Sequence, residues 1–309
     1  VKAVGGSTLH WNGLSFRAQP HEFKARTTYG EVEGASLADW PVTYDELDPY
    51  YSRAEDKMGV TGTHGIKRHP ANNNYKVLYN GAQRIGYTQI SNARQAINSE
   101  FRDGRGACIQ LGFCNQGCKM GAKWSTLYSE IPKAEETGNL ELRSGCMVLR
   151  IEHDKAGNAN GVIYVDGDGV EQRQSARVVC VAGNAIETPR LLLNSNSSLF
   201  PDGMANSSGE VGRNYVRHVG AIVFGEFDKP VNMHRGITVP GTVFDEARFD
   251  PSRGFAGGYL IEAVSLGLTN LAVVGDAAGW GRNYTGILEK YDHLAGVLLN
   301  GEDMPRSQN

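Results

Sequence analysis

Residues 4–13 read VGGSTLHWNG, a segment that brings small residues, two hydroxyl side chains and one histidine together. Paired glycines let backbone N–H groups approach a ligand closely, and the hydroxyls of Ser7 and Thr8 can donate to a pyrophosphate or to the polar edge of a ring. The same composition also suits a tight loop that needs glycine at positive φ. On its own, this segment indicates either an anion-binding loop or a structural turn.

A second segment, VVCVAGNAIETPRLLLNS at residues 178–195, predicts a strand, a turn and a helix in that order. The apolar run at 177–181 is typical of a strand buried on both faces of a parallel sheet. Small residues then predict the turn, and Thr188-Pro189 predicts the start of a helix. This order favours an α/β arrangement.

Other local patterns predict the elements around these two segments. Alternating apolar and polar residues at 140–143, 147–153, 161–165 and 170–174 predict a small antiparallel meander. Thr43 and Glu46 have the spacing of a capping box, so a helix is expected to follow Thr43 and to end at Gly59. The alternation at 218–227 predicts a strand, residues 240–268 predict further sheet, and residues 284–299 predict a closing helix.

Together, the segments at 4–13 and 178–195 resemble the two signature regions of the glucose–methanol–choline (GMC) family of flavin-dependent oxidoreductases. Residues 40–62, 108–126 and 299–309 resemble the branch of that family with gluconate, fructose and glucose dehydrogenase flavoprotein subunits. The resemblance covers nearly the whole chain, and two long motifs in the correct order are specific.

The patterns and the resemblance together predict an α/β fold with α+β features. Residues 1–214 are expected to form part of a Rossmann-like FAD/NAD(P)-binding domain, with a cysteine-rich loop at 104–123 and the meander at 140–174. Residues 215–309 are expected to form part of a substrate-domain sheet. Complete family members begin with a strand, a Gly-x-Gly-x-x-Gly turn and a helix, which this sequence does not contain. We therefore expect a central fragment.

The resemblance also implies which residues contact FAD. His10 occupies the position that lies over the flavin, where some members bind the cofactor covalently; a hydrogen-bonded core histidine is the alternative. Val148 occupies the position where the main chain contacts adenine, although core packing explains an apolar strand residue equally well. The expected FAD contacts are Gly5, Gly6, Ser7, His10, Asn12, Gly13, Val148, Ala182, Gly183 and Thr188. The turn Gly212-Arg213-Asn214, with His218, is expected either to close over the flavin or to lead into a strand. The family's catalytic histidine is expected beyond Asn309, so no catalytic residue is assigned.

Three cysteines, Cys108, Cys114 and Cys118, are spaced C-x5-C-x3-C in a glycine-rich loop. Thiolates at such spacing can hold an iron–sulfur cluster, and some members of the resembled branch carry one at a similar loop. Those members use an adjacent cysteine pair, whereas Ile109 follows Cys108 here. A disulfide and free buried thiols are the alternatives.

Composition excludes several classes of function. The 309 residues include 31 basic and 34 acidic side chains, with a net charge of −3 and no basic run, so nucleic acid is not an expected partner. No apolar segment is long enough to span a bilayer, and the motifs of zinc proteases, Walker-type nucleotidases and serine hydrolases are absent.

The expected function is therefore that of an FAD-dependent dehydrogenase. Its substrate would be the CH–OH group of a sugar, sugar acid or polyol, and its electrons would pass to an acceptor other than NAD. The alternative is a non-catalytic iron–sulfur or metal module built on the three cysteines. A small accessory subunit and a cytochrome c subunit are the expected protein partners. We expect the fragment alone to be inactive.

Overall fold

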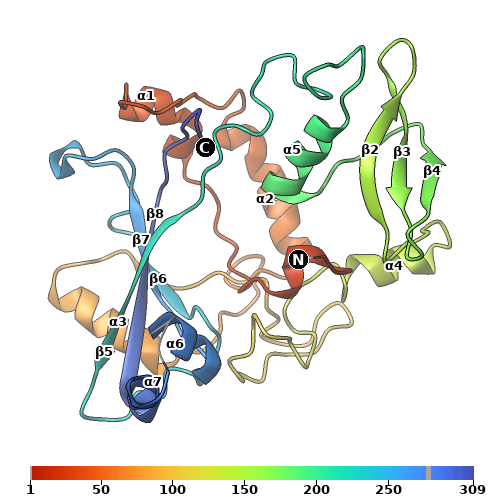
Figure 1. Ribbon diagram of the computed structural model, residues 1–309. Helices are drawn as coiled ribbons and strands as arrows, with labels where there is room; N and C mark the ends of the chain where they lie inside the picture. The colour runs from red at the N-terminus through yellow and green to blue at the C-terminus, as the bar shows by residue number, and fades with distance from the viewer. Residues whose placement is uncertain (1, 276–279) are drawn as a thin grey trace. The chain divides into compact units, whose positions relative to one another are not determined.

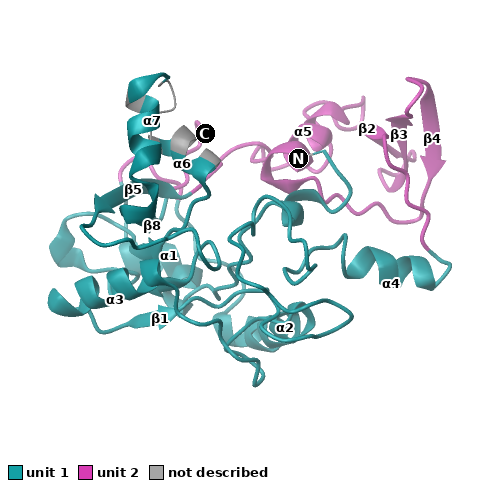
Figure 2. Ribbon diagram, turned by 90° about the horizontal axis from the view of Figure 1, so that it is seen from below, with its two compact units in different colours: residues 1–32, 37–139, 218–303 teal, residues 33–36, 140–217, 304–309 magenta. Residues whose placement is uncertain are grey.

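A computed structural model describes residues 2–275 and 280–309 (Figure 1). Contacts between Cα atoms divide the chain into two compact units (Figure 2). Unit 1 contains residues 1–32, 37–139 and 218–303, and unit 2 contains residues 33–36, 140–217 and 304–309. The predicted domains at 1–214 and 215–309 are defined by the ligand that each is expected to bind, whereas the two units are defined by contacts within the chain. The predicted domains therefore remain a prediction. Within the described residues, no helix is long and apolar enough to cross a membrane.

Unit 1 is built on a five-stranded antiparallel sheet in the order β1-β6-β7-β8-β5. Its strands are β1 (Ile90–Asn92), β5 (Val219–Glu226), β6 (Gly241–Val243), β7 (Tyr259–Ala263) and β8 (Leu294–Gly301). Its helices and 3-10 turns are η1 (Gly6–Leu9), η2 (Pro20–Lys24), α1 (Ala25–Tyr29), α2 (Tyr44–Met58), α3 (Asn73–Arg84), α4 (Glu130–Glu136), η3 (Pro251–Arg253), α6 (Leu268–Gly275), α7 (Arg282–Glu289) and η4 (Tyr291–His293).

Helix α2 confirms the local prediction at its two ends. The Thr43 hydroxyl accepts a hydrogen bond from the Glu46 N–H, and the Glu46 carboxylate accepts one from the Thr43 N–H, which is the predicted capping box. At the other end, Gly59 adopts the left-handed conformation at φ 74°, where a side chain would be strained. Each signal lies within a few residues of the helix end that it marks, so the sequence alone suffices to place both ends of α2.

The prediction of a helix over 284–299 is confirmed for residues 284–289 and is wrong for the remainder. Only Arg282–Glu289 is helical, and the rest forms η4 and strand β8. Strand β8 lies between β7 and β5 and pairs with both. The spacing of apolar residues suits a helix, but pairing on both edges, with Leu294 and Ala295 buried in the core, stabilises the strand instead.

Unit 2 contains the predicted meander, as three antiparallel strands. These are β2 (Met147–His153), β3 (Ala159–Val165) and β4 (Glu171–Ser175). Asp154 and Asp166 form its two turns, where each carboxylate accepts hydrogen bonds from main-chain N–H groups two and four residues ahead. A further predicted strand at 140–143 is wrong: the segment is irregular, and Leu140 and Leu142 are exposed.

The predicted buried strand at 177–181 is also absent from unit 2. The segment is irregular and pairs with no strand among the described residues, and the Val178 side chain is 76% exposed. An apolar run becomes a buried strand only where other elements cover both of its faces. Helix α5 (Asn184–Asn194) also begins earlier than predicted, because the Asn184 side chain accepts the N–H groups of Ile186 and Glu187.

Candidate functional site

Within the segment Gly5–Gly13, residues Gly6–Leu9 form the 3-10 turn η1; Gly5, which precedes the turn, and Gly6, its first residue, both adopt positive φ. A Cβ atom on Gly5 would lie 2.9 Å from Leu9 and 3.0 Å from Leu127, so packing within the protein requires glycine there. A Cβ atom on Gly6 would meet no atom within 4 Å. Gly5 therefore packs tightly against neighbouring side chains, whereas the space beside Gly6 is free.

The loop is held against the segment at 122–127 by side-chain hydrogen bonds. The hydroxyls of Thr8 and Thr126 both donate to the Gly5 carbonyl, at 2.5 and 3.2 Å, and the Thr126 N–H donates to the Thr8 hydroxyl at 3.3 Å. The Trp11 indole N–H donates to the Trp124 carbonyl at 3.0 Å, and the two indole rings meet edge to face. These contacts fix the loop from both of its ends.

Lys123 is a further anchor of the loop, and it was not assigned a role from the sequence. Its side chain is almost fully buried, and its Nζ donates to the carbonyls of Leu9 at 3.0 Å and Trp11 at 2.7 Å. These two residues flank His10, whose side chain is exposed. Burial lowers the pKa of Lys123. The only sequence signal was a lysine inside a run of small and apolar residues.

Asn12 and Gly13 pack inside unit 1. The Asn12 side-chain oxygen accepts from the Thr238 hydroxyl at 2.9 Å. The Gly13 carbonyl accepts from the Ala96 N–H at 2.7 Å, and a Cβ atom on Gly13 would lie 3.0 Å from Ile97. Among the predicted contacts in unit 1, Gly6, Ser7 and His10 are therefore the ones that lie open.

The other predicted contacts lie in unit 2. Val148 is 41% exposed on β2, and Ala182 and Gly183 are exposed before α5. The Gly183 N–H donates to the Thr188 hydroxyl at 2.9 Å, which closes the turn at the start of the helix. Because these residues and the loop lie in different units, their convergence on one cofactor stays a prediction.

The turn at 212–216 lies beside α5 within unit 2. Residues of both segments line a pocket of about 530 Å³, and Gly212 and Asn214 adopt positive φ. The side-chain amide of Asn214 donates to Glu210 at 2.6 Å, which holds the turn. The arrangement is compatible both with a turn that closes over the flavin and with a turn that leads into a strand.

The cysteine-rich loop forms an apolar pocket of about 280 Å³ in unit 1. Cys108, Cys114 and Cys118 all line it, and all five cysteines of the chain are free thiols. Burial raises the pKa of Cys108 to about 11 and also raises that of Cys114, so both remain protonated at neutral pH. Among the described residues, no three His, Cys, Asp or Glu side chains are arranged to hold a metal ion.

Buried polar groups support this loop. His69 lies with Nε2 2.9 Å from the Ile97 carbonyl and Nδ1 3.2 Å from the Gln110 amide nitrogen, so its neutral form carries the proton on Nε2. Burial lowers the pKa of His69, which favours that neutral form. The main-chain N–H of Gln110 also donates to the Cys108 sulfur at 3.4 Å.

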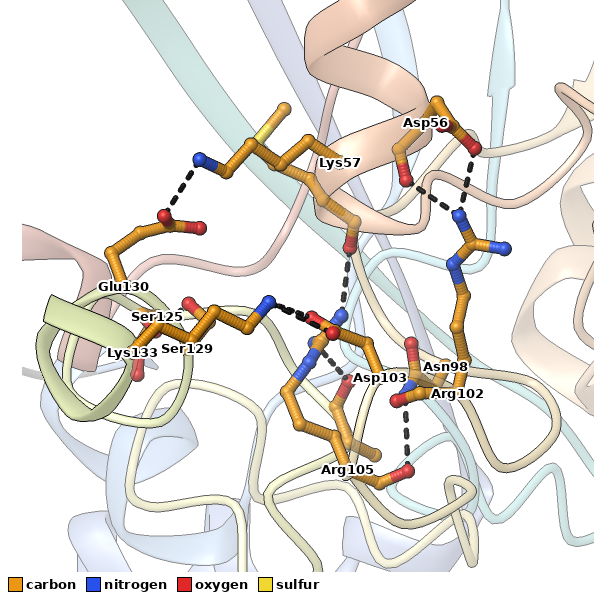
Figure 3. A network of polar contacts seen from close by, with 12 residues as sticks. Asp56, Lys57, Asn98, Arg102, Asp103, Arg105, Ser125, Ser129, Glu130 and Lys133 are labelled. Atoms are coloured by element: carbon orange, nitrogen blue, oxygen red, sulfur yellow. Dashed lines mark hydrogen bonds and ion pairs between the residues drawn. The ribbon is translucent and has the colours of Figure 1, made fainter. Parts of the chain in front are cut away.

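A second network anchors the loop to α2 and α4, as Figure 3 shows. The buried guanidinium of Arg105 donates to the carbonyls of Met58 and Ala122, both at 3.1 Å. Around it, three ion pairs join α2, α4 and the residues 102–103 that lead into the loop: Arg102 with Asp56, Lys133 with Asp103, and Lys57 with Glu130. The loop therefore has fixed ends.

Comparison with known proteins identifies the fold and the family. A computed family profile described as GMC oxidoreductase matches residues 1–220. The chain is 36% identical over 233 residues to the fructose dehydrogenase large subunit of Gluconobacter japonicus, covering 71% of this chain and 42% of that protein. It is 31% identical over 336 residues to the 2-methyl-1,2-propanediol dehydrogenase of Mycolicibacterium austroafricanum, covering 99% and 58%.

A third relative is the gluconate 2-dehydrogenase flavoprotein of Pantoea cypripedii, at 26% identity over 96% of this chain and 56% of that protein. The crystal structure of formate oxidase has a similar fold, with a TM-score of 0.62 and 13% identity over 96% of this chain and 57% of that chain. The chain thus spans about half the length of the relatives it matches, and the mixed α/β fold is confirmed. From its sequence, the chain belongs to the GMC oxidoreductase family.

Proposed function

We propose that this chain is part of an FAD-dependent oxidoreductase that acts on the CH–OH group of a sugar, sugar acid or polyol. The observation that carries the proposal is the loop at Gly6, Ser7 and His10, which is open to a ligand. Hydrogen bonds from the buried Lys123 ammonium to main-chain carbonyls of the loop fix its position. The names of the relatives support it, because they describe dehydrogenases of fructose, gluconate and a diol.

The residues present fit a cofactor at this loop. The space beside Gly6 is free, the Ser7 hydroxyl and the His10 imidazole are exposed, and hydrogen bonds to neighbouring segments fix the main chain that carries them. In unit 2, Val148 and Gly183 are exposed, as residues that contact the cofactor must be. When bound, FAD supplies a hydride acceptor for the alcohol carbon. The chain's own part is to bind and orient that group through preformed main chain.

The rest of the proposal concerns organisation. We assign residues 1–214 to the cofactor-binding part and residues 215–309 to the substrate-binding part. A small accessory subunit and a cytochrome c subunit are proposed as partners that carry electrons away. The relative named a large subunit and the relative named a flavoprotein support an assembly of several chains.

An iron–sulfur cluster at the cysteine loop is the second cofactor to test. Its support is that Cys108, Cys114 and Cys118 line one pocket, while the described side chains are not arranged around a metal ion. Iron analysis and electron paramagnetic resonance of the full-length protein decide the matter. A signal that disappears in Cys114→Ser establishes the cluster, and absence of iron rejects it.

The flavin proposal is tested with the full-length protein that contains this chain. Gly6→Asn keeps the backbone conformation accessible, because asparagine tolerates positive φ, and fills the open space beside the loop. Gly65→Asn is the matched control, since Gly65 also has positive φ and open space around it. We expect Gly6→Asn to lose bound flavin, measured by absorbance, and Gly65→Asn to retain it.

Substrate class is tested by dye-linked dehydrogenase assays with fructose, gluconate, sorbitol and 2-methyl-1,2-propanediol. Turnover of at least one, in proportion to flavin content, is expected. A protein that binds no flavin, or a Gly6→Asn variant with full flavin content, would contradict the assignment.

A further inference from the structure

We propose that unit 1 carries a binding site for a small organic anion, which is independent of the proposed flavin site. The site is a pocket of about 380 Å³ whose lining includes none of residues 4–13. It is bounded by Phe16, Arg17, Ala18, Gln19, Pro20, Tyr44, Arg68, Ser91, Arg94 and Phe244.

The first argument is the excess of positive charge. Arg17 uses four of its N–H donors: two on the carboxylate of Glu55, at 2.8 and 2.7 Å, and two on Asp48 and the Tyr44 hydroxyl. The hydrogen bonds from Arg17 lower the pKa of Glu55, so this buried carboxyl group is ionised. Arg17 and the two carboxylates are therefore a self-contained group with one negative charge in excess.

Arg94 and Arg68 add two positive charges to that group. The nearest approach of the Arg94 guanidinium to Glu55 is 3.5 Å, to Oε1, which already accepts a hydrogen bond from Arg17. The Arg94 side chain is 37% exposed. Arg68 is exposed and donates to the carbonyl of Asn92; within the described residues it has no carboxylate partner. The three arginines and the two carboxylates therefore sum to one positive charge, and Arg68 and Arg94 keep N–H donors that no carboxylate among the described residues engages in a close, paired contact.

The second argument is an apolar wall formed by two aromatic rings that line the same pocket. Phe16 and Phe244 are both half-buried and meet edge to face, with ring centroids 5.3 Å apart. Gln19 and Ser91, which also line the pocket, supply neutral hydrogen-bonding groups. A neighbouring pocket of about 340 Å³ shares Gln19, Ser91 and Phe244 and adds Arg248, so there is room for a body larger than the anionic group alone.

These features specify a class of ligand. Guanidinium groups recognise carboxylate and phosphate oxygens through paired, charge-assisted hydrogen bonds. A pocket of this size, lined by both polar and aromatic side chains, suits a small molecule rather than a bare ion. The ligand is therefore a carboxylate or phosphate monoester with an apolar or ring-shaped body, its oxyanion on Arg68 and Arg94 and its body against Phe16 and Phe244.

Titration calorimetry on the full-length protein at low salt tests this. The probes are phenyl phosphate, benzoate, inorganic phosphate, acetate and benzyl alcohol. We expect the two aromatic anions to bind more tightly than inorganic phosphate and acetate, and benzyl alcohol not to bind. The stronger of the aromatic anions identifies the oxyanion. Equal binding of benzyl alcohol would show that charge plays no part, and equal binding of inorganic phosphate would show that the aromatic wall plays none; either result overturns the proposal.

Two variants test the residues. Arg68→Gln and Arg94→Gln should each weaken binding of the aromatic anions by about tenfold or more, as expected for the loss of a charge-assisted hydrogen bond. Arg68 is exposed, so its variant should fold normally. Arg150→Gln is the control, because Arg150 is an exposed arginine paired with Glu171 in unit 2. Unchanged affinity in both pocket variants, or no anion binding by the unmodified protein, rejects the site whether or not flavin is bound.

Discussion

Lys123 is a buried cation whose partners are main-chain carbonyls rather than a carboxylate. Burying an ammonium group opposes the charged form, which is the cause of its lowered pKa. What offsets this desolvation is the pair of carbonyls on either side of His10. A single side chain therefore fixes the main chain on which the proposed cofactor contact depends.

Lys123→Met should destabilise the protein because it removes both hydrogen bonds and leaves two carbonyls without them. Each unsatisfied buried group costs about 1–3 kcal/mol, so we expect the free energy of unfolding in urea to fall by roughly 2–4 kcal/mol. Lys119→Met is the matched control on an exposed lysine of the same loop, with an expected change within about 0.5 kcal/mol. Equal effects of the two substitutions would contradict the anchoring role.

Glu262 should make stability depend on pH. It is buried on β7, and burial raises its pKa from the usual 4.5 to about 7. Between these values the folded state binds more protons than the unfolded state, so the free energy of unfolding falls as pH rises from about 4.5 to 7. A shift of this size corresponds to about 3 kcal/mol. Glu262→Gln, which mimics the protonated form, should flatten this slope.

The measurement is urea unfolding at several pH values, with Glu136→Gln on exposed α4 as the control. If the Glu262→Gln variant keeps the slope of the unmodified protein, Glu262 is not its source.

At the scale of elements, β8 depends on a glycine near its start, Gly296. Its neighbours are β7 and β5, and a Cβ atom on Gly296 would lie 2.5 Å from the Phe224 ring of β5. The Gly296 N–H also donates to the Asn74 side chain of α3, at 2.9 Å, which ties the strand to the helix beside it. Close approach, rather than a special φ, is what requires glycine here.

Gly296→Ala should therefore force β5 and β8 apart, and we expect a loss of about 1–3 kcal/mol, as is typical of overpacking. Gly220→Ala on β5 is the matched control in the same sheet: its Cβ atom would lie no closer than 3.5 Å to any neighbour. Thermal and urea unfolding of the two variants should differ clearly. Similar stability of both would mean that the two strands can move apart at little cost.

At the scale of the whole molecule, the surroundings of a segment decide what its sequence becomes. The run at 177–181 is irregular and Val178 is exposed, although its composition predicts a strand covered on both faces. In a polypeptide of residues 1–309, Val178→Ser should change the free energy of unfolding by no more than about 0.5 kcal/mol, as for other surface substitutions. A loss of several kcal/mol would mean that the segment is buried after all.

The sequence by itself determined the features whose causes lie close together along the chain. The capping box of α2, the aspartate turns of the meander and the two long motifs that identify the family each depend on residues a few positions apart. Local hydrogen bonds and fixed turn geometries act within such short segments, so their residues can be read directly.

Only the tertiary structure decided features that depend on distant partners. Strand β8 replaced a predicted helix because β5 and β7, which come earlier in the chain, pair with both of its edges. Lys123 anchors the loop through carbonyls more than a hundred residues away in the sequence. The pocket proposed to bind an anion is lined by residues that range from Phe16 to Phe244. Burial and pairing are properties of the space around a residue, and no local pattern records which segments will fill that space.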